Sequence, residues 1–183
     1  MNTLNNVLEL LNKDLLHLGH PGGSSDAHKR AIGLAHGLAG LIRLISVRPL
    51  YVSFDISSKI MSLAIQLLKD SGAHELHISI VEIQVAWILV SALTALGPNF
   101  VRMHLPQLLL LWKNALPKPA ARDGTNNIQL ARSDVEWSFL LHLRECTLTS
   151  ILSFLQANRE KLVTLDIARR IATMLSNALS FIS

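Results

Sequence analysis

The chain has 183 residues, of which 50% are hydrophobic, 16% charged and 5% aromatic, and its formal net charge is +4. This length allows one domain with a sizeable core, and the dispersal of Lys and Arg in singles and pairs argues against nucleic acid as the main partner. Cys146 is the only cysteine, which excludes an internal disulfide and a metal cluster of several cysteines, and favours a reducing, intracellular compartment.

Leu, Ile and Ala supply most of the apolar content, so the sequence predicts an almost wholly α-helical protein. The first predicted helix spans 4–18, where Leu4, Leu8, Leu11 and Leu15 recur at helical spacing. The segment lacks the basic start and apolar core of a secretory signal.

The second predicted helix spans 26–46. Its buried stripe is expected at Leu34, Leu38, Leu41 and Ile45. Gly33, Gly37 and Gly40 lie in the same segment, and glycines inside a helix cost up to about 1 kcal/mol each. They therefore suggest a neighbouring helix that approaches closely, the alternative being that they are merely tolerated.

The third and fourth predicted helices span 55–70 and 75–96. The inward residues of the third are expected to be Ile56, Ile60, Leu63, Leu67 and Leu68. The fourth is apolar on nearly all sides, so it needs neighbours before, behind and beside it, as a helical solenoid supplies. The uncharged run 83–101 approaches the length of a membrane span, but Gly97-Pro98 interrupts it, which favours a buried helix of a soluble protein.

Beyond this break, Pro98 is expected to open a short helical turn, and a new helix is expected to begin at Leu105-Pro106 and to end near 116. Its inward residues are expected to be Leu105, Leu108, Leu109 and Trp112. The polar segment 117–132 contains two prolines and a glycine and is predicted to be an exposed loop.

Ser133 and Glu136 have the spacing of a capping box, which predicts a long helix to about 157. Its buried stripe is expected at Leu140, Leu143, Thr147, Ile151 and Phe154. The last predicted helix follows Thr164 and continues to the end of the chain. Its inward residues are expected to be Ile167, Ile171, Met174, Ala178 and Ile182.

The sequence predicts about six or seven helices in antiparallel pairs, and the length of each pair matches the period of HEAT or armadillo repeats. The predicted fold is therefore an all-α, right-handed α-α superhelix. Residues 1–183 are expected to form a single helical-repeat unit within a longer solenoid, because the last helix keeps an apolar face to its end.

Residue chemistry indicates no catalytic, cofactor or metal site. The most closely spaced histidines are His17/His20 and His74/His77, and only Glu75 lies beside either pair, so ordinary surface histidines are the preferred interpretation.

Cys146 lies one helical turn from His142, so Cys146 could act as a nucleophile with His142 as its base, but no oxyanion loop accompanies them. A small buried hydrophobe is the preferred role for this cysteine. Trp87, Trp112 and Trp137 are expected to fill the core. We therefore expect a protein that is not an enzyme.

One local charge bias stands out. No acidic residue occurs between Glu82 and Asp123. The basic residues in this interval are Arg102, Lys113, Lys118 and Arg122, here called the basic window. It is a candidate surface for an acidic peptide or for anionic lipid headgroups, against the alternative of an ordinary solvated edge.

Three segments resemble a known family. They are ISSKIMSLAIQLLKD at 56–70, VAWILVSALTALGPNFVRMHLPQLLLLWKNALPK at 85–118 and RRIATMLSNAL at 169–179. They resemble a part of the giant HEAT-repeat proteins known as HEAT repeat-containing protein five and the large clathrin-adaptor accessory protein. The specific part is GPxxVxxHLPxLLLLWKN at 97–114, whereas 117–132 departs from the family in length and composition.

The resemblance implies a non-enzymatic scaffold, cytoplasmic and peripheral at Golgi and endosomal membranes. Its expected partners are clathrin-adaptor complex subunits or their accessory proteins, and the rest of the same solenoid, with peripheral membrane contact as an option. No cofactor is expected, and no partner-binding residue can be transferred from the family. The alternative is a small self-standing helical protein associated with membranes.

Overall fold

The computed structural model describes residues 2–19, 25–47, 54–118 and 133–182, and these ranges contain helices and no strand. The α-helices are α1 (Asn2–His17), α2 (Ser25–Val47), α3 (Phe54–Asp70), α4 (Leu76–Thr94), α5 (Pro98–Ala115), α7 (Asp134–Leu162) and α8 (Leu165–Ile182), and a 3-10 turn, η2, occupies Ser71–Ala73. The all-α prediction is confirmed. The first four helices begin and end within two residues of their predicted bounds.

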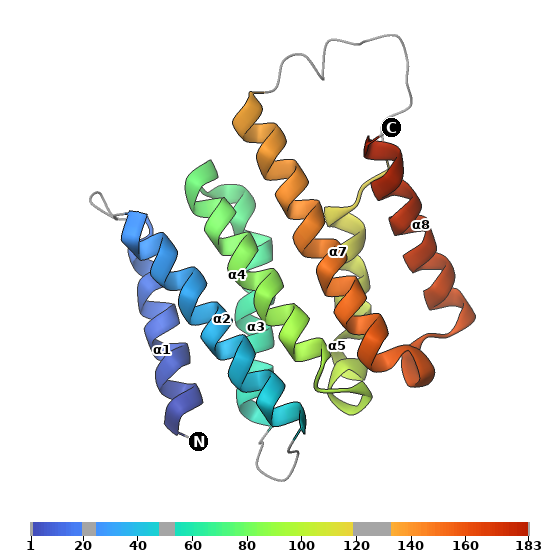
Figure 1. Cartoon of the computed structure of the whole chain (residues 1–183), viewed down its shortest axis with the longest axis horizontal. Coiled ribbons are helices and arrows are strands. Elements are labelled where there is room, and N and C mark those ends of the chain that lie inside the picture. The colour runs from blue at the N-terminus through green and yellow to red at the C-terminus, as the bar shows by residue number, and fades with distance from the viewer. Residues whose placement is uncertain (1, 20–24, 48–53, 119–132, 183) are drawn as a thin grey trace.

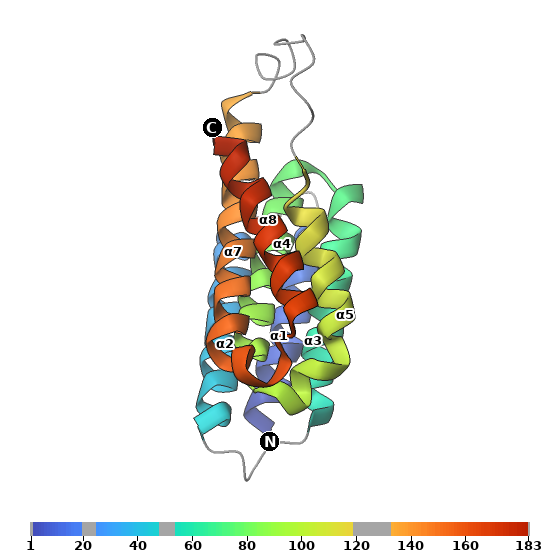
Figure 2. The same cartoon turned by 90° about the vertical axis from the view of Figure 1, so that its right-hand side faces the viewer.

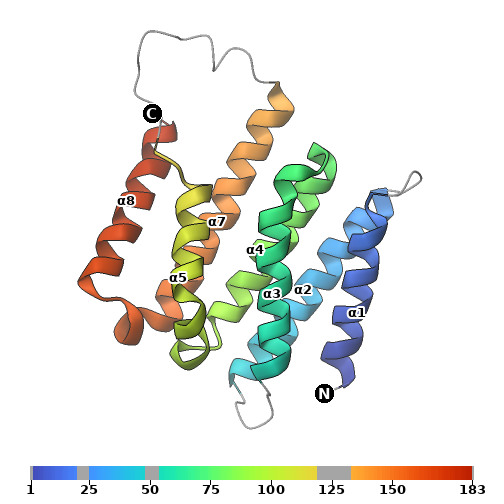
Figure 3. The ribbon, with the colours of Figure 1, turned by 180° about the vertical axis from the view of Figure 1, so that it is seen from behind.

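The helices form two layers with opposite chain directions. Helices α2, α4 and α7 run in one direction and lie side by side, whereas α1, α3, α5 and α8 run in the other (Figure 1). The edge-on view separates α2 and α7 from α3 and α5 (Figure 2), and the view from behind places α1, α3 and α5 in front (Figure 3). The most extensive contacts join α4 to α2 and to α7. Helix α4 is therefore the centre of the molecule.

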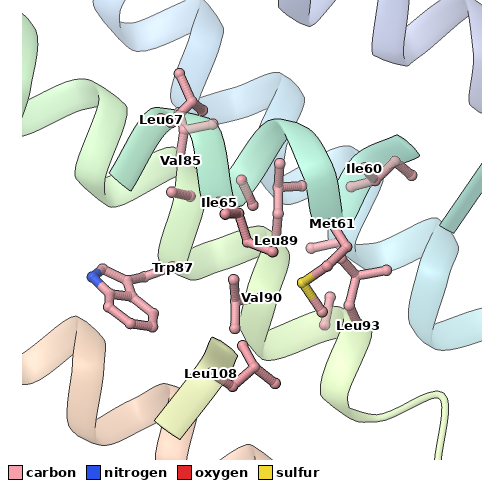
Figure 4. Packing of buried hydrophobic residues seen from close by; sticks show 14 of the residues in the cluster. Ile60, Met61, Ile65, Leu67, Val85, Trp87, Leu89, Val90, Leu93 and Leu108 are labelled. Carbon is pink, nitrogen blue, oxygen red and sulfur yellow. The ribbon is translucent and has the colours of Figure 1, made fainter. Parts of the chain in front are cut away.

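Helix α4 is buried around most of its circumference, as its sequence predicts. Its side chains pack against α2, α3 and α7, so a helix with almost no polar face loses nearly all contact with water. Figure 4 shows Leu89 and Leu93 of α4 beside Met61 of α3, with Trp87 on another side of the helix. Trp87 and Trp112 are buried, which confirms them as core residues, whereas Trp137 is half-buried.

The interior face of α2 differs from the predicted stripe. Leu38 is buried, but the other three predicted residues are half-buried. The buried face is made by Ala27, Ala31, Ala35, Leu38, Ala39 and Ile42. Alanine side chains allow α2 to lie close to α1 and α4, which explains why the bulkier leucines are displaced to the edges of the contact.

The expected close approach at the glycines of α2 is wrong. Gly33, Gly37 and Gly40 are exposed, and a Cβ atom added to any of them would meet no other atom within 4 Å. The glycines lie on the side of α2 opposite its alanines. They are tolerated in the helix without a packing role in this chain.

The predicted break at Leu105-Pro106 is also wrong, because α5 continues from Pro98 to Ala115 with Pro106 in its interior. Pro106 is exposed, so the carbonyl group that its missing N–H leaves without a helical partner lies on the side of the helix that water reaches. The predicted inward residues are nevertheless correct. All four are buried: Leu105, Leu108, Leu109 and Trp112.

Helices α7 and α8 begin as predicted. The Ser133 hydroxyl accepts a hydrogen bond from the Glu136 N–H at 3.3 Å, and the Glu136 carboxylate accepts one from the Ser133 N–H at 3.0 Å, which completes the capping box. Helix α7 continues to Leu162, more than one turn beyond its predicted end. The predicted loop 117–132 lies outside the described residues except for Pro117 and Lys118, which are exposed.

The predicted stripes of α7 and α8 are largely correct. Their buried members are Thr147, Ile151, Phe154, Ile171, Met174 and Ala178, and their half-buried members are Leu140, Leu143 and Ile167. The side chain of Ile182 lies outside the described residues.

Candidate protein-binding surface

Helix α5 carries Arg102 and Lys113 of the basic window, and its start is fixed by two residues. Gly97 has a φ of +92°, a backbone conformation that favours glycine, and Pro98 occupies the first turn, where its missing N–H needs no partner. The Val101 N–H donates to the Gly97 carbonyl at 3.1 Å. Gly97 and Pro98 therefore separate α4 from α5 and reverse the direction of the chain.

Helix α5 is anchored by its inner side. The Trp112 indole N–H donates to the Ser150 hydroxyl at 3.1 Å, and the Trp112 ring lies 5.3 Å from the Phe154 ring, so α5 is held against α7 by both polar and aromatic contacts. Beyond the helix, the Asn177 side chain of α8 donates to the Leu116 carbonyl at 3.3 Å. These contacts fix which side of α5 faces outward.

The structure brings two residues of the basic window onto one face. Arg102 and Lys113 are exposed and lie eleven residues apart on α5, a spacing of three helical turns within about 20°. Lys118 is exposed beyond the end of the helix, and Arg122 lies outside the described residues. Within the described ranges, neither Arg102 nor Lys113 forms an ion pair with a carboxylate.

Three apolar residues between these cations were missed by sequence reasoning. Met103 and Leu110 have exposed fractions of 66% and 55%, and Pro106 between them is also exposed. The predicted break at Pro106 divided this face into two unrelated pieces. A continuous helix read from Pro98 would have placed all three residues on one stripe with Arg102 and Lys113, because they recur every three or four residues.

Cys146 does not have the properties of an activated nucleophile. Its sulfur lies 3.5 Å from the His142 Nε2 atom, but the thiol is half-buried, and this burial, together with the charge of Glu145, raises its pKa to about 11. A nucleophilic cysteine has a lowered pKa. The geometry favours the expected role of Cys146 as a small hydrophobe.

His74 and His77 contact different carboxylates. The His74 Nδ1 atom lies 2.8 Å from the buried Glu82 carboxylate, and this hydrogen bond and charge raise the pKa of His74. His77 contacts Glu75 at 3.3 Å, and its ring lies 5.8 Å from that of His28. In the described part of the chain no three ligands of the kind that hold a metal ion come together.

The remaining predicted histidine pair is only partly described. The His17 Nδ1 atom lies 2.6 Å from the Lys13 carbonyl oxygen, a local contact at the end of α1, and His20 lies outside the described residues.

No protein-family model matches this sequence, and no solved structure matches this chain. The resemblance to the giant HEAT-repeat proteins therefore stays a prediction. The outer face of α5 is the candidate protein-binding surface.

Proposed function

We propose that this chain is a helical-repeat scaffold for protein binding, built as a right-handed α-α solenoid of the HEAT or armadillo type. The arrangement of its helices supports this fold. Three successive pairs, α1/α2, α3/α4 and α5/α7, place their second members side by side with the same chain direction (Figure 1). Repeated pairs stacked in this way are typical of solenoids, whereas neighbouring helices of a simple up-and-down bundle alternate in direction.

The outer face of α5 is the observation that carries the binding function. Arg102 and Lys113 flank exposed apolar residues, and no acidic residue occurs from 83 to 122, so the sequence around them supplies no carboxylate to neutralise them. A surface with apolar residues and uncompensated cations suits an acidic protein partner.

The family resemblance gives the cellular part of the proposal. It suggests a cytoplasmic, non-enzymatic scaffold that is peripheral at Golgi and endosomal membranes and assists clathrin-adaptor-dependent traffic between the trans-Golgi network and endosomes. Its proposed partners are clathrin-adaptor complex subunits or their accessory proteins.

Neighbouring repeats of the same solenoid are the second class of proposed partner. A shallow hollow between α7 and α8 is lined by Leu141, Leu148, Leu152 and Ala178, among others. Leu141 and Leu152 are about half exposed. A further helix of the same solenoid could pack on this apolar hollow, which is lined mainly by α7.

Affinity capture from cell lysate tests the proposed function. The 183-residue chain is compared with the double variant Arg102→Glu/Lys113→Glu and with the control Lys59→Glu/Lys69→Glu, which reverses two exposed charges on α3. We expect clathrin-adaptor subunits to be retained by the wild type and the control and lost from the α5 variant. Absence of adaptor subunits from the wild-type sample would reject the traffic function. Equal retention by all three would reject α5 as the contact.

The alternative is a small, self-standing helical protein associated with membranes, and one observation favours it. The segments Asp26–Val47 and Leu76–Thr94 are long and apolar enough to cross a membrane by length and composition alone. In the second segment, 67% of the 18-residue apolar window is buried inside the fold, as expected for the core helix of a soluble protein. Release of the expressed chain from membranes by alkaline carbonate would contradict integration, whereas a requirement for detergent would support it.

A further inference from the structure

We propose that the occupant of the outer face of α5 is an amphipathic helix that lies lengthwise on α5 and carries an acidic residue at each end of its apolar stripe. This inference deepens the proposed scaffold function and rests on it for the class of partner. The surface concerned, here called the α5 face, consists of Arg102, Met103, Pro106, Leu110 and Lys113.

The centre of the α5 face is apolar and exposed. Met103 and Leu110 are exposed by 66% and 55%, and Pro106 separates them on the same stripe. Scattered single apolar residues are normal on protein surfaces, but three on one stripe form a continuous strip about two helical turns long. Methionine has a flexible side chain that adapts to different apolar partners. The strip is suited to an apolar stripe on another helix.

The ends of the α5 face are cationic. The eleven residues from Arg102 to Lys113 correspond to about 16 Å along the helix axis. Charge complementarity therefore requires two acidic groups about 16 Å apart with apolar residues between them. A partner helix meets this requirement with acidic residues ten or eleven positions apart and apolar residues at intervals of three and four.

The backbone of α5 favours a helical occupant over an extended one. One way of binding an extended peptide, the addition of a strand to a sheet edge, needs an exposed strand, and the described residues contain none. A second helix needs only side-chain contacts along its apolar stripe. Its apolar residues repeat with the same period as those of α5.

The surroundings of the α5 face favour a protein partner over an anionic membrane. Helices α1 and α3 lie in the same layer as α5 (Figure 3). The exposed residues of α1 and α3 carry charges of both signs, Glu9, Asp55 and Asp70 beside Lys13, Lys59 and Lys69. A planar anionic bilayer laid on this layer would therefore gain little net attraction outside α5, whereas a single helix about 10 Å wide can cover α5 alone.

A display library of helical peptides, randomised on one face, tests this proposal by selection on the purified, full 183-residue chain. We expect the selected peptides to carry an apolar stripe with acidic residues at both ends. Their affinity, measured by fluorescence anisotropy, should fall by about tenfold or more in the double variant Arg102→Glu/Lys113→Glu, because two attractions become repulsions. The control Lys59→Glu/Lys69→Glu should bind as the wild type does. Circular dichroism checks that each variant keeps its helical content.

Two further measurements separate the occupants. The variant Leu110→Ser should weaken peptide binding by several fold and leave its dependence on salt unchanged. The chain should not co-sediment with vesicles containing phosphatidylserine at physiological salt. Selection of peptides without acidic residues, equal binding by the α5 double variant, or binding to the vesicles in place of peptides would each overturn the proposal, as would a selection that yields no peptide.

The selection uses purified components, so its result is separable from that of the capture experiment. Successful selection without capture of adaptor subunits would keep the acidic helix as the ligand and reject the traffic function. Capture of adaptor subunits with a failed selection would keep the traffic function and reject the acidic helix.

Discussion

The Cys146 thiol has a pKa raised to about 11 by burial, so its reactive thiolate form is scarce at neutral pH. Against the ordinary value of 9.0, this shift lowers the thiolate fraction about 100-fold. Because a thiolate of higher pKa is also a stronger nucleophile, we expect alkylation of Cys146 by iodoacetamide at pH 7.4 to be about tenfold or more slower than that of an unhindered thiol. Mass spectrometry of timed samples measures this rate. A rate equal to that of glutathione would reopen a nucleophilic role.

His74 and Glu82 make the stability of the chain dependent on pH. Their contact raises the pKa of His74 in the folded state, so folding favours the protonated imidazole. This contribution is fully present below the ordinary histidine pKa of 6.5 and is lost as the pH rises through the raised value. The variant His74→Gln should therefore be least stable relative to wild type at the acidic end of a series from about pH 5.5 to 9.

Urea unfolding at each pH measures this difference. The variant Glu82→Gln should lose the same pH dependence, because it removes the other half of the pair. A stability difference between wild type and His74→Gln that stays constant across the series would show that the contact does not depend on protonation.

The exposed glycines of α2 give a prediction at the scale of a helix. Gly37→Ala should raise the free energy of unfolding by about 0.5–1 kcal/mol, since the added methyl group meets no other atom and the unfolded chain loses conformational freedom. Gly97→Ala should have the opposite effect and cost about 1–3 kcal/mol, because its φ of 92° and ψ of 179° lie in a region that is almost confined to glycine. Denaturant unfolding of both variants measures the two signs. A stabilising Gly97→Ala would contradict the assigned backbone conformation.

Periodicity and capping chemistry predicted most helices, but they misjudged which face of α2 is buried and where α5 begins. The Ser133–Glu136 capping box is local, so the sequence alone identified it. The interior face of α2 was misjudged because Ala31 and Ala35 are less hydrophobic than the leucines. They are buried only because α1 and α4 pack closely against them. This preference is set by the tertiary structure and is invisible in one segment.

The candidate surface was predicted only in its charges. Arg102 and Lys113 were identified from the absence of nearby acidic residues, which is a property of sequence. The apolar centre of the α5 face was missed because a proline was taken to begin a helix, whereas the packing of Trp112 and its neighbours keeps α5 continuous through Pro106. Tertiary contacts outweighed the tendency of proline to interrupt a helix.

The stability of the whole molecule depends on α4. Leu89→Ala removes a fully buried side chain of this helix and should cost about 2–5 kcal/mol, whereas Leu110→Ala on the exposed face of α5 should change the free energy of unfolding by less than about 0.5 kcal/mol. Because α4 contacts helices from both halves of the chain, Leu89→Ala should move the entire transition without creating a second one. Circular dichroism during urea unfolding measures both. A variant in which only part of the helical signal shifts would show that the two ends unfold separately.

The central position of α4 also has a consequence for protein synthesis. The ribosome completes α4 at Thr94, but α7, which covers one of its sides, is complete only at Leu162. At about 5–20 residues per second, this interval lasts several seconds, during which an apolar helix waits with one side uncovered. We therefore expect a nascent chain stalled in that interval to bind molecular chaperones, and a product truncated there to aggregate.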